Sequence, residues 1–156
     1  MRKIIFRAKR IDNGEWIFGV PVEQNGDVVL VGDLDSYRMV YDLWENAAYV
    51  LPETVGQYIG LTDKNGKKIF EGDIIKSDNG RVSAISVVKY GEFEPKLFYD
   101  LWQFHLLKRP KVKMCGLFAK DIESNEEMLV SNCSKLIEVI GNVYDTPELL
   151  EGGGNG

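Results

Sequence analysis

The chain has 156 residues, enough to bury a hydrophobic core without disulfides or metals. Hydrophobic residues make up 44% of it and aromatic residues 11%, a composition that excludes an intrinsically disordered chain. The formal net charge of −5 argues against a protein whose whole surface attracts nucleic acids or other polyanions.

The sequence carries no signal for a membrane or for secretion. No apolar run approaches the ~18 residues that span a bilayer, and no apolar segment follows the basic N-terminus as it does in a secretory signal. Cys115 and Cys133 are the only cysteines, too few for a disulfide framework. We therefore expect a cytoplasmic protein that does not bind a membrane.

The start of the chain shows the two-residue alternation that is typical of half-buried strands. In residues 2–10 the even-numbered positions give an apolar face, with Ile4, Phe6 and Ala8. The odd-numbered positions give a mostly basic outer face, with Lys3, Ile5, Arg7 and Lys9. A turn at residues 12–14 and a strand over residues 15–20 complete a first predicted hairpin, and a short strand is predicted over residues 27–31.

Turn signals continue along the chain. Asn-Gly dipeptides begin at residues 13, 25, 65 and 79, and such regular turns favour a compact all-β body. Residues 36–47 have apolar positions spaced like one face of a short helix, although the same residues also suit a strand. Thr146 and Pro147 predict a last helical turn with Thr146 as its N-cap. Further strands are predicted in VGQYIGL, KKIF, DIIKS, RVSAISVVKY, KVKMCGLFA and KLIEVIGNVYD.

These patterns predict a mainly-β fold, either a small β-barrel or a strongly bent antiparallel sheet, with one or two short helices. We expect one domain over residues 1–150 and a flexible glycine-rich tail over residues 151–156. The segment GDIIKSDNGRVSAISVVKY resembles the first hairpin of SH3-like barrels, which often bind peptides or nucleic acids.

Residues 60–73, GLTDKNGKKIFEGD, are the segment densest in charged residues and glycine. They do not match a phosphate-binding P-loop, because the glycine spacing is wrong and no hydroxyl residue follows the lysine. They do not match a calcium loop either, because lysines and Ile74 stand at positions that need glycine or oxygen ligands. The segment is predicted to be a hairpin in which Asn65 and Gly66 accept positive φ.

The sequence does not predict a catalytic or metal site. His105 is the only histidine, and a triad would need it beside a nucleophile such as Cys115 and an acid such as Asp100 or Asp121. Nothing in the spacing supports this, and the apolar neighbours of His105 favour a structural role. One histidine and two cysteines without a Cys-x-x-Cys motif fall short of a zinc site. We therefore predict no catalytic residue, no metal and no cofactor.

Carboxylates occur in three close pairs that could hold a cation or support acid–base chemistry. The pairs are Asp33 with Asp35, Glu92 with Glu94, and Glu126 with Glu127. Solvated turns are the favoured interpretation, because charged pairs in loops are common on protein surfaces.

A second candidate region combines cations with aromatic side chains. It comprises Trp102, Phe104, Lys108, Arg109, Lys111 and Lys113, with Arg7 and Lys9 of the basic N-terminal segment. Such a mixture binds single-stranded nucleic acid, because cations hold the backbone and aromatic rings stack on bases. The acidic net charge favours the other interpretation, in which the aromatic residues belong to the core and the lysines to a solvated rim.

Three blocks of the sequence resemble a known family. GQYIGLTDKNGKKIFEGDII closely resembles the central signature of the YopX family, KIIFRAK resembles its opening strand and VIGNVYDTPELL its closing segment. The blocks occur in the family's order and frame nearly the whole chain, whereas residues 31–50 and 92–131 match no part of the signature. The resemblance implies a phage or prophage origin and hence a bacterial host. It implies no chemistry, because the family has no established activity.

We therefore predict a non-enzymatic binding or regulatory protein that acts on a host or phage protein and forms homo-oligomers. Its predicted interaction surface consists of Asp63, Lys64, Asn65, Lys67, Lys68, Glu71 and Asp73. Two alternatives remain open. One is a nucleic-acid-binding accessory protein that uses basic patches at residues 2–10 and 108–113, and the other is an enzyme that uses the clustered carboxylates.

Overall fold

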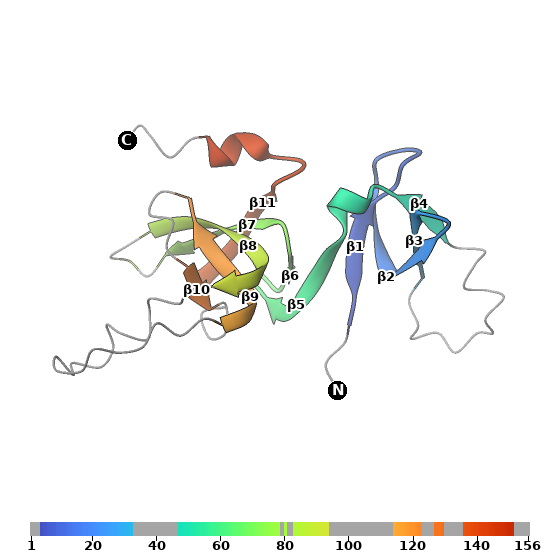
Figure 1. Ribbon diagram of the computed structural model, residues 1–156. Coiled ribbons are helices and arrows are strands. Elements are labelled where there is room, and N and C mark those ends of the chain that lie inside the picture. The colour runs from blue at the N-terminus through green and yellow to red at the C-terminus, as the bar shows by residue number, and fades with distance from the viewer. Residues whose placement is uncertain are drawn as a thin grey trace. The chain divides into compact units, whose positions relative to one another are not determined.

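The computed structural model describes residues 4–32, 47–78, 80, 83–93, 114–122, 127–129 and 136–151 (Figure 1). The chain divides into two compact units, Met1–Gly60 and Leu61–Gly156. One strand, β5 (Gly56–Thr62), runs across this boundary, so the two units share it. The expected single domain over residues 1–150 and the flexible tail both stay predictions.

The described residues form antiparallel strands and two short 3-10 helices, which confirms the mainly-β prediction. Each sheet has an open order with two different edge strands, so the architecture is that of a bent sheet and not of a closed barrel. The elements are β1 (Phe6–Lys9), β2 (Trp16–Gln24), β3 (Asp27–Val31), β4 (Ala48–Val50), η1 (Pro52–Thr54), β5 (Gly56–Thr62), β6 (Lys68–Phe70), β7 (Asp73–Asp78), β8 (Ser83–Phe93), β9 (Met114–Asp121), β10 (Glu127–Leu129), β11 (Ile137–Asn142) and η3 (Pro147–Leu150).

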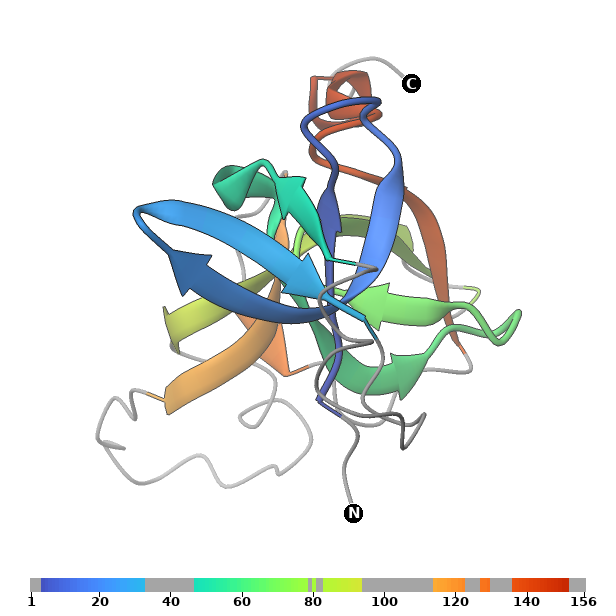
Figure 2. The ribbon, with the colours of Figure 1, turned by 90° about the vertical axis from the view of Figure 1, so that its right-hand side faces the viewer.

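In the first unit the hydrogen-bonded order is β4-β3-β2-β1-β5. Tight turns join its first three strands, with φ of 71° at Gly14, 55° at Asn25 and 89° at Gly26. The Asn-Gly dipeptides predict these turns, because asparagine and glycine tolerate positive φ at low cost. β2 and β3 form a long twisted hairpin, drawn in blue in Figure 2.

The sheet of the first unit is strongly bent. At the end of β1, Arg10 forms an isolated bridge with Val50 of β4, although β2 and β3 lie between them in the strand order. This bend brings Ala8, Leu30 and Val50 together as a buried cluster, each at most 1% exposed. Gly19 makes a close approach inside the bend, since a Cβ there would stand 2.1 Å from the Val31 carbonyl oxygen.

In the second unit the order is β10-β9-β8-β7-β11, and β6 pairs with the shared strand β5. The ladder between β7 and β11 shifts register between Val139 and Gly141. The central strands are buried on both faces, because the adjacent residues Ile74 and Ile75, like Val87 and Val88, point to opposite sides of the sheet and are all buried. The buried apolar residues of the second unit are Ile69, Phe70, Ile74, Ile75, Val87, Val88, Ile137 and Val139.

The structure differs from the sequence prediction in several local features. The short strands β4 and β10 were not predicted. Glu92 lies in β8 and Glu127 in β10, so the turns predicted for these two residues are wrong. Residues 36–46 of the expected helix lie outside the described residues.

The predicted last helical turn is present as η3, and Thr146 occupies its N-cap position. The capping role is wrong, however, because the Thr146 hydroxyl makes no bond to the helix. It donates to the Asn142 carbonyl oxygen and accepts from the Asn142 N–H, each at 3.0 Å. The hydroxyl therefore closes the turn before η3.

A Gly19→Ala substitution should destabilise the first unit, because its Cβ would meet the Val31 backbone at 2.1 Å. Overpacking of this kind costs about 1–3 kcal/mol. Thermal and urea unfolding should show this loss, while Gln24→Ala at an exposed position of the same strand should change little. Equal stability of the Gly19→Ala variant and the wild type would contradict the close approach.

Candidate functional site

The segment from residue 60 to 73 forms the hairpin of β5 and β6, as predicted. Its turn closes through the Asp63 N–H, which donates to the Lys67 carbonyl at 2.8 Å, and the Gly66 N–H, which donates to the Asp63 carbonyl at 3.0 Å. Gly66 has a φ of 82°, a conformation that residues with a Cβ rarely adopt. The predicted hairpin and the positive φ of Gly66 are therefore confirmed, whereas the positive φ expected at Asn65 is wrong, because Asn25 is the one described non-glycine residue with a positive φ.

The Asp63 carboxylate organises this turn from inside. Its Oδ1 accepts the N–H groups of Asn65 at 2.8 Å and Lys67 at 2.9 Å. Its Oδ2 accepts the N–H of Val139 in β11 at 3.0 Å. Only 5% of Asp63 is exposed, so its placement on an interaction surface is wrong, and its role is to hold the hairpin together.

Two opposing effects act on the charge of Asp63. Burial raises the pKa of this carboxyl, because desolvation penalises the charged form. The N–H groups of Val139, Lys67 and Asn65 lower it, helped by the Lys67 ammonium. The hydrogen bonds outweigh burial, and the pKa of Asp63 lies below its usual value.

The same turn covers an edge of the second sheet. β11 pairs with β7 on one side, and on its other side the Lys64 N–H donates to the Ile137 carbonyl at 2.9 Å. Together with the bond from Val139 to Asp63, this contact satisfies backbone groups that an edge strand would otherwise leave open. The hairpin thus serves as the lateral neighbour of β11.

The turn at the end of the segment is also fixed from inside. Asp73 is 1% exposed, and its Oδ2 accepts the Phe70 N–H at 2.8 Å. Gly72 donates its N–H to the Val88 carbonyl and accepts the N–H of Val143, both at 2.9 Å. Placing Asp73 on the interaction surface is wrong for the same reason as for Asp63.

The remaining candidates of the hairpin differ in exposure. Lys64, Asn65, Lys67 and Lys68 are exposed, whereas Glu71 is half-buried. The Lys64 ammonium forms an ion pair with Glu138 of β11 at 2.5 Å, and this hydrogen bond raises the pKa of Lys64. The structure thus divides the segment into acids that face inward and lysines that face solvent.

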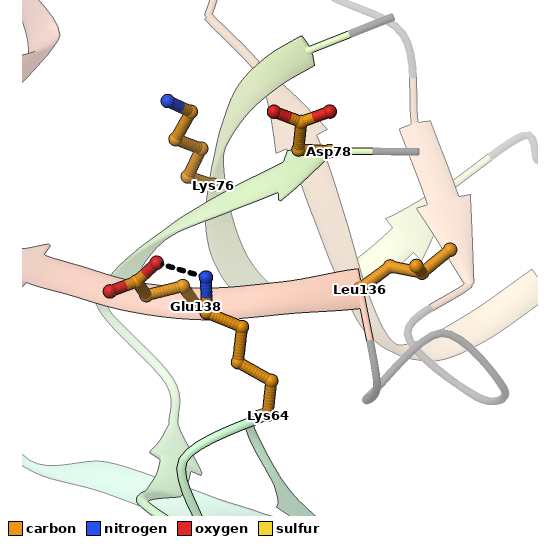
Figure 3. A pocket seen from close by; sticks show the side chains of 5 residues that line it. All are labelled: Lys64, Lys76, Asp78, Leu136 and Glu138. Atoms are coloured by element: carbon orange, nitrogen blue, oxygen red, sulfur yellow. Dashed lines mark ion pairs between the residues drawn. The ribbon is translucent and has the colours of Figure 1, made fainter. Parts of the chain in front are cut away.

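A shallow depression of about 130 Å³ lies beside the hairpin on the second unit. Both basic and acidic side chains line it. Figure 3 shows Lys64 extending from the hairpin toward Glu138, with Lys76 and Asp78 on β7. It is lined by Lys64, Lys76, Asp78, Leu136 and Glu138.

The second predicted patch is only partly described. Trp102, Phe104, Lys108, Arg109, Lys111 and Lys113 lie outside the described residues. Arg7 is 8% exposed and so does not belong to a basic outer face. Its guanidinium carbon lies 4.7 Å from the centroid of the Trp16 ring, and the Lys9 ammonium lies 5.5 Å from that centroid.

Sequence reasoning missed Trp16. The register of the first hairpin places Trp16 directly opposite Lys9, and extending the predicted pairing across the turn at residues 12–14 is sufficient to find it. The cation–π contacts explain the burial of Arg7, because a guanidinium lies favourably against an indole face. The aromatic partner of Arg7 and Lys9 is therefore Trp16 of the neighbouring strand β2.

The other candidate residues lie mostly outside the described part of the chain: Asp33, Asp35, Glu94, Asp100, His105, Glu126 and Cys133. Cys115 and Asp121 lie in β9. Among the described residues, no group of three histidine, cysteine, aspartate or glutamate side chains is placed to hold a metal ion.

The comparisons with known proteins identify the family. The model of the YopX protein family matches residues 5–151. The chain belongs to the YopX family. The crystal structure of protein EF1440 from Enterococcus faecalis has a similar fold, with a TM-score of 0.50 and 22% sequence identity, over 96% of this chain and 99% of that chain. No similar sequence is found among the curated proteins. Within the described residues, no helix is long and apolar enough to cross a membrane.

Substitution of Asp63 should test the buried carboxylate. Asp63→Asn removes the charge and turns an N–H toward a backbone donor, so we expect a loss of about 2–3 kcal/mol near neutral pH. Urea unfolding measures this loss. The matched control is Glu138→Gln, an exposed acid of the same site, which should cost less than about 1 kcal/mol.

The pH dependence follows from the lowered pKa of Asp63. The unfolded chain binds a proton at this residue near pH 3.9, before the folded protein does. The stability that Asp63 contributes is therefore fully present above about pH 4 and is lost as the pH falls through the lower folded pKa. The unfolding free energies of the wild type and Asp63→Asn should converge below about pH 4. A constant difference down to pH 3 would contradict this role.

Ser86 lies in the core of the second unit, and its replacement is expected to keep or raise stability, unlike the replacement of Asp63. It is 1% exposed, and its hydroxyl oxygen has no hydrogen-bond partner among the described residues. A buried unsatisfied hydroxyl costs about 1–3 kcal/mol, so Ser86→Ala should leave stability unchanged or raise it. Thermal unfolding would measure this, with the exposed Ser83→Ala as the control. A clear loss of stability in Ser86→Ala alone would contradict the assignment.

Proposed function

We propose that this YopX family member is a non-enzymatic binding module that acts on a host or phage protein in the cytoplasm of a bacterial host. Family membership supports the phage or prophage origin, because the family is typically encoded in phages and prophages. The likeness of the β7–β8 segment to SH3-like hairpins also agrees with a binding role.

The observation that carries the proposal is the division of charge in the β5–β6 hairpin. Asp63 and Asp73 face inward and accept backbone N–H groups, while Lys64, Lys67 and Lys68 are exposed. The lysines thus stand on a backbone that is already fixed, and preorganised surfaces bind with a smaller entropic cost. An acidic patch on the partner would complement them, and such charges increase association rate and selectivity.

The same geometry argues against acid–base chemistry at this site. A general base must reach the proton that it removes from a substrate. Asp63 and Asp73 lie buried and accept hydrogen bonds from the backbone of their own turns. They are structural carboxylates, so an enzyme that used this hairpin would need another base.

Capture from host lysate tests the proposal, run with and without nuclease. The tagged protein should retain a stoichiometric protein partner that survives nuclease treatment. Lys67→Ala with Lys68→Ala should weaken capture at least tenfold, because rim charges of this kind guide and hold the complex. The matched control is Lys89→Ala with Lys120→Ala on β8 and β9, which should retain the partner. Capture that disappears with nuclease, or that is equally weakened by both double variants, would contradict the proposal.

A further inference from the structure

One face of the first unit combines aromatic rings and cations on three neighbouring strands. β1 lies between β2 and β5 (Figure 1), and its residues Arg7 and Lys9 pair with Phe18 and Trp16 of β2. On the other side Arg7 pairs with Gly56, and Tyr58 lies two residues further along β5. Cross-strand partners and alternate residues share one side of a sheet. We call this set the aromatic face: Arg7, Lys9, Trp16, Phe18 and Tyr58.

The rings of the aromatic face differ in how they are held. Trp16 is half-buried and is fixed by both cations, at 4.7 Å from Arg7 and 5.5 Å from Lys9. Tyr58 is also half-buried, and its backbone N–H donates to the Ile5 carbonyl at 2.8 Å. Phe18 is 55% exposed. The face therefore has two half-buried rings, Trp16 and Tyr58, and Phe18 is its most exposed ring.

The local charge of the face is positive although the whole chain is acidic. Along these three described strands, the positions that share the face carry Arg7 and Lys9 and no carboxylate. Arg7 is buried, with 8% of it exposed, so the half-buried Lys9 is the cation that lies nearer to solvent. Glu15, the acid next to Trp16, accepts the side-chain N–H of Asn13 at 2.9 Å and is held at the turn. A polyanion thus meets a favourable local field here.

We propose that the aromatic face binds single-stranded nucleic acid, with an unpaired base stacked on Phe18 and a neighbouring phosphate near Lys9. Proteins that bind single strands combine these two elements, because every base has a π-face and every nucleotide a charge. A duplex does not fit this chemistry, since its bases are already stacked. Binding is weak and its salt dependence shallow, because each phosphate contact on a single strand contributes a slope of only about −0.7.

The test is fluorescence anisotropy with a labelled oligothymidylate and an oligouridylate of about 15 nucleotides, long enough for one site, together with a duplex of the same length. We expect binding of the single strands at low salt and little binding of the duplex. Phe18→Ala should weaken single-strand binding about five- to a hundredfold, the usual effect of losing one stacked base. The matched control is Tyr90→Ala, an aromatic residue of the second unit that is 61% exposed, which should bind as the wild type does.

A second pair of variants separates stacking from folding. Phe18→Leu keeps an apolar side chain but removes the π-face, so it should fold normally and lose binding, whereas Phe18→Trp should keep or increase affinity. Circular dichroism and thermal unfolding check the fold of each variant. The proposal is wrong if no oligonucleotide binds, if the duplex binds as well as the single strand, or if Phe18→Leu binds like the wild type. It is also wrong if Phe18→Leu instead loses a protein partner that survives nuclease.

Discussion

In the second unit a carboxylate keeps its charge while almost wholly buried, and three backbone N–H groups make this possible. Two of these groups come from the hairpin turn and the third from Val139, 76 residues further along the chain. A buried charge without such partners would cost several kcal/mol. Asp63 therefore does two things with one side chain: it closes the turn of the hairpin and joins that turn to β11.

The contacts around Asp63 show why the central and closing blocks of the sequence act as one structure. The Glu-Gly-Asp turn meets the closing block at Gly72, whose carbonyl accepts the Val143 N–H at 2.9 Å. A Cβ on Gly72 would touch the Tyr144 ring at 3.4 Å, and Lys64 pairs with Glu138 across the same junction. The segments that resemble the family signature thus pack against each other. The exposed lysines lie on the surface of this packed structure.

The sequence predicts local features of this protein well and distant ones poorly. Alternation and Asn-Gly dipeptides are properties of neighbouring residues, so they locate β1, β2, β3 and the β5–β6 turn. The burial of Asp63 depends on Val139, and no short-range pattern indicates that partner. The burial of Arg7 depends on Trp16 across a hairpin. In both cases the sequence predicts a surface position, because charged residues are usually exposed. They are buried only when a partner such as Val139 or Trp16 compensates the charge, and the local sequence does not show that partner.

The two candidate surfaces follow one physical principle in different units. In the hairpin, backbone hydrogen bonds to a buried acid fix the positions from which lysines extend. On the aromatic face, cation–π contacts fix an indole beside which Phe18 extends. In each case the buried polar group fixes the neighbouring residues before a partner binds, so less conformational entropy is lost on binding. The affinity therefore depends on this buried group as well as on the side chain that contacts the partner. The buried charged residues Asp63 and Arg7 are therefore informative about function, because each one fixes the position of residues that we propose contact a partner.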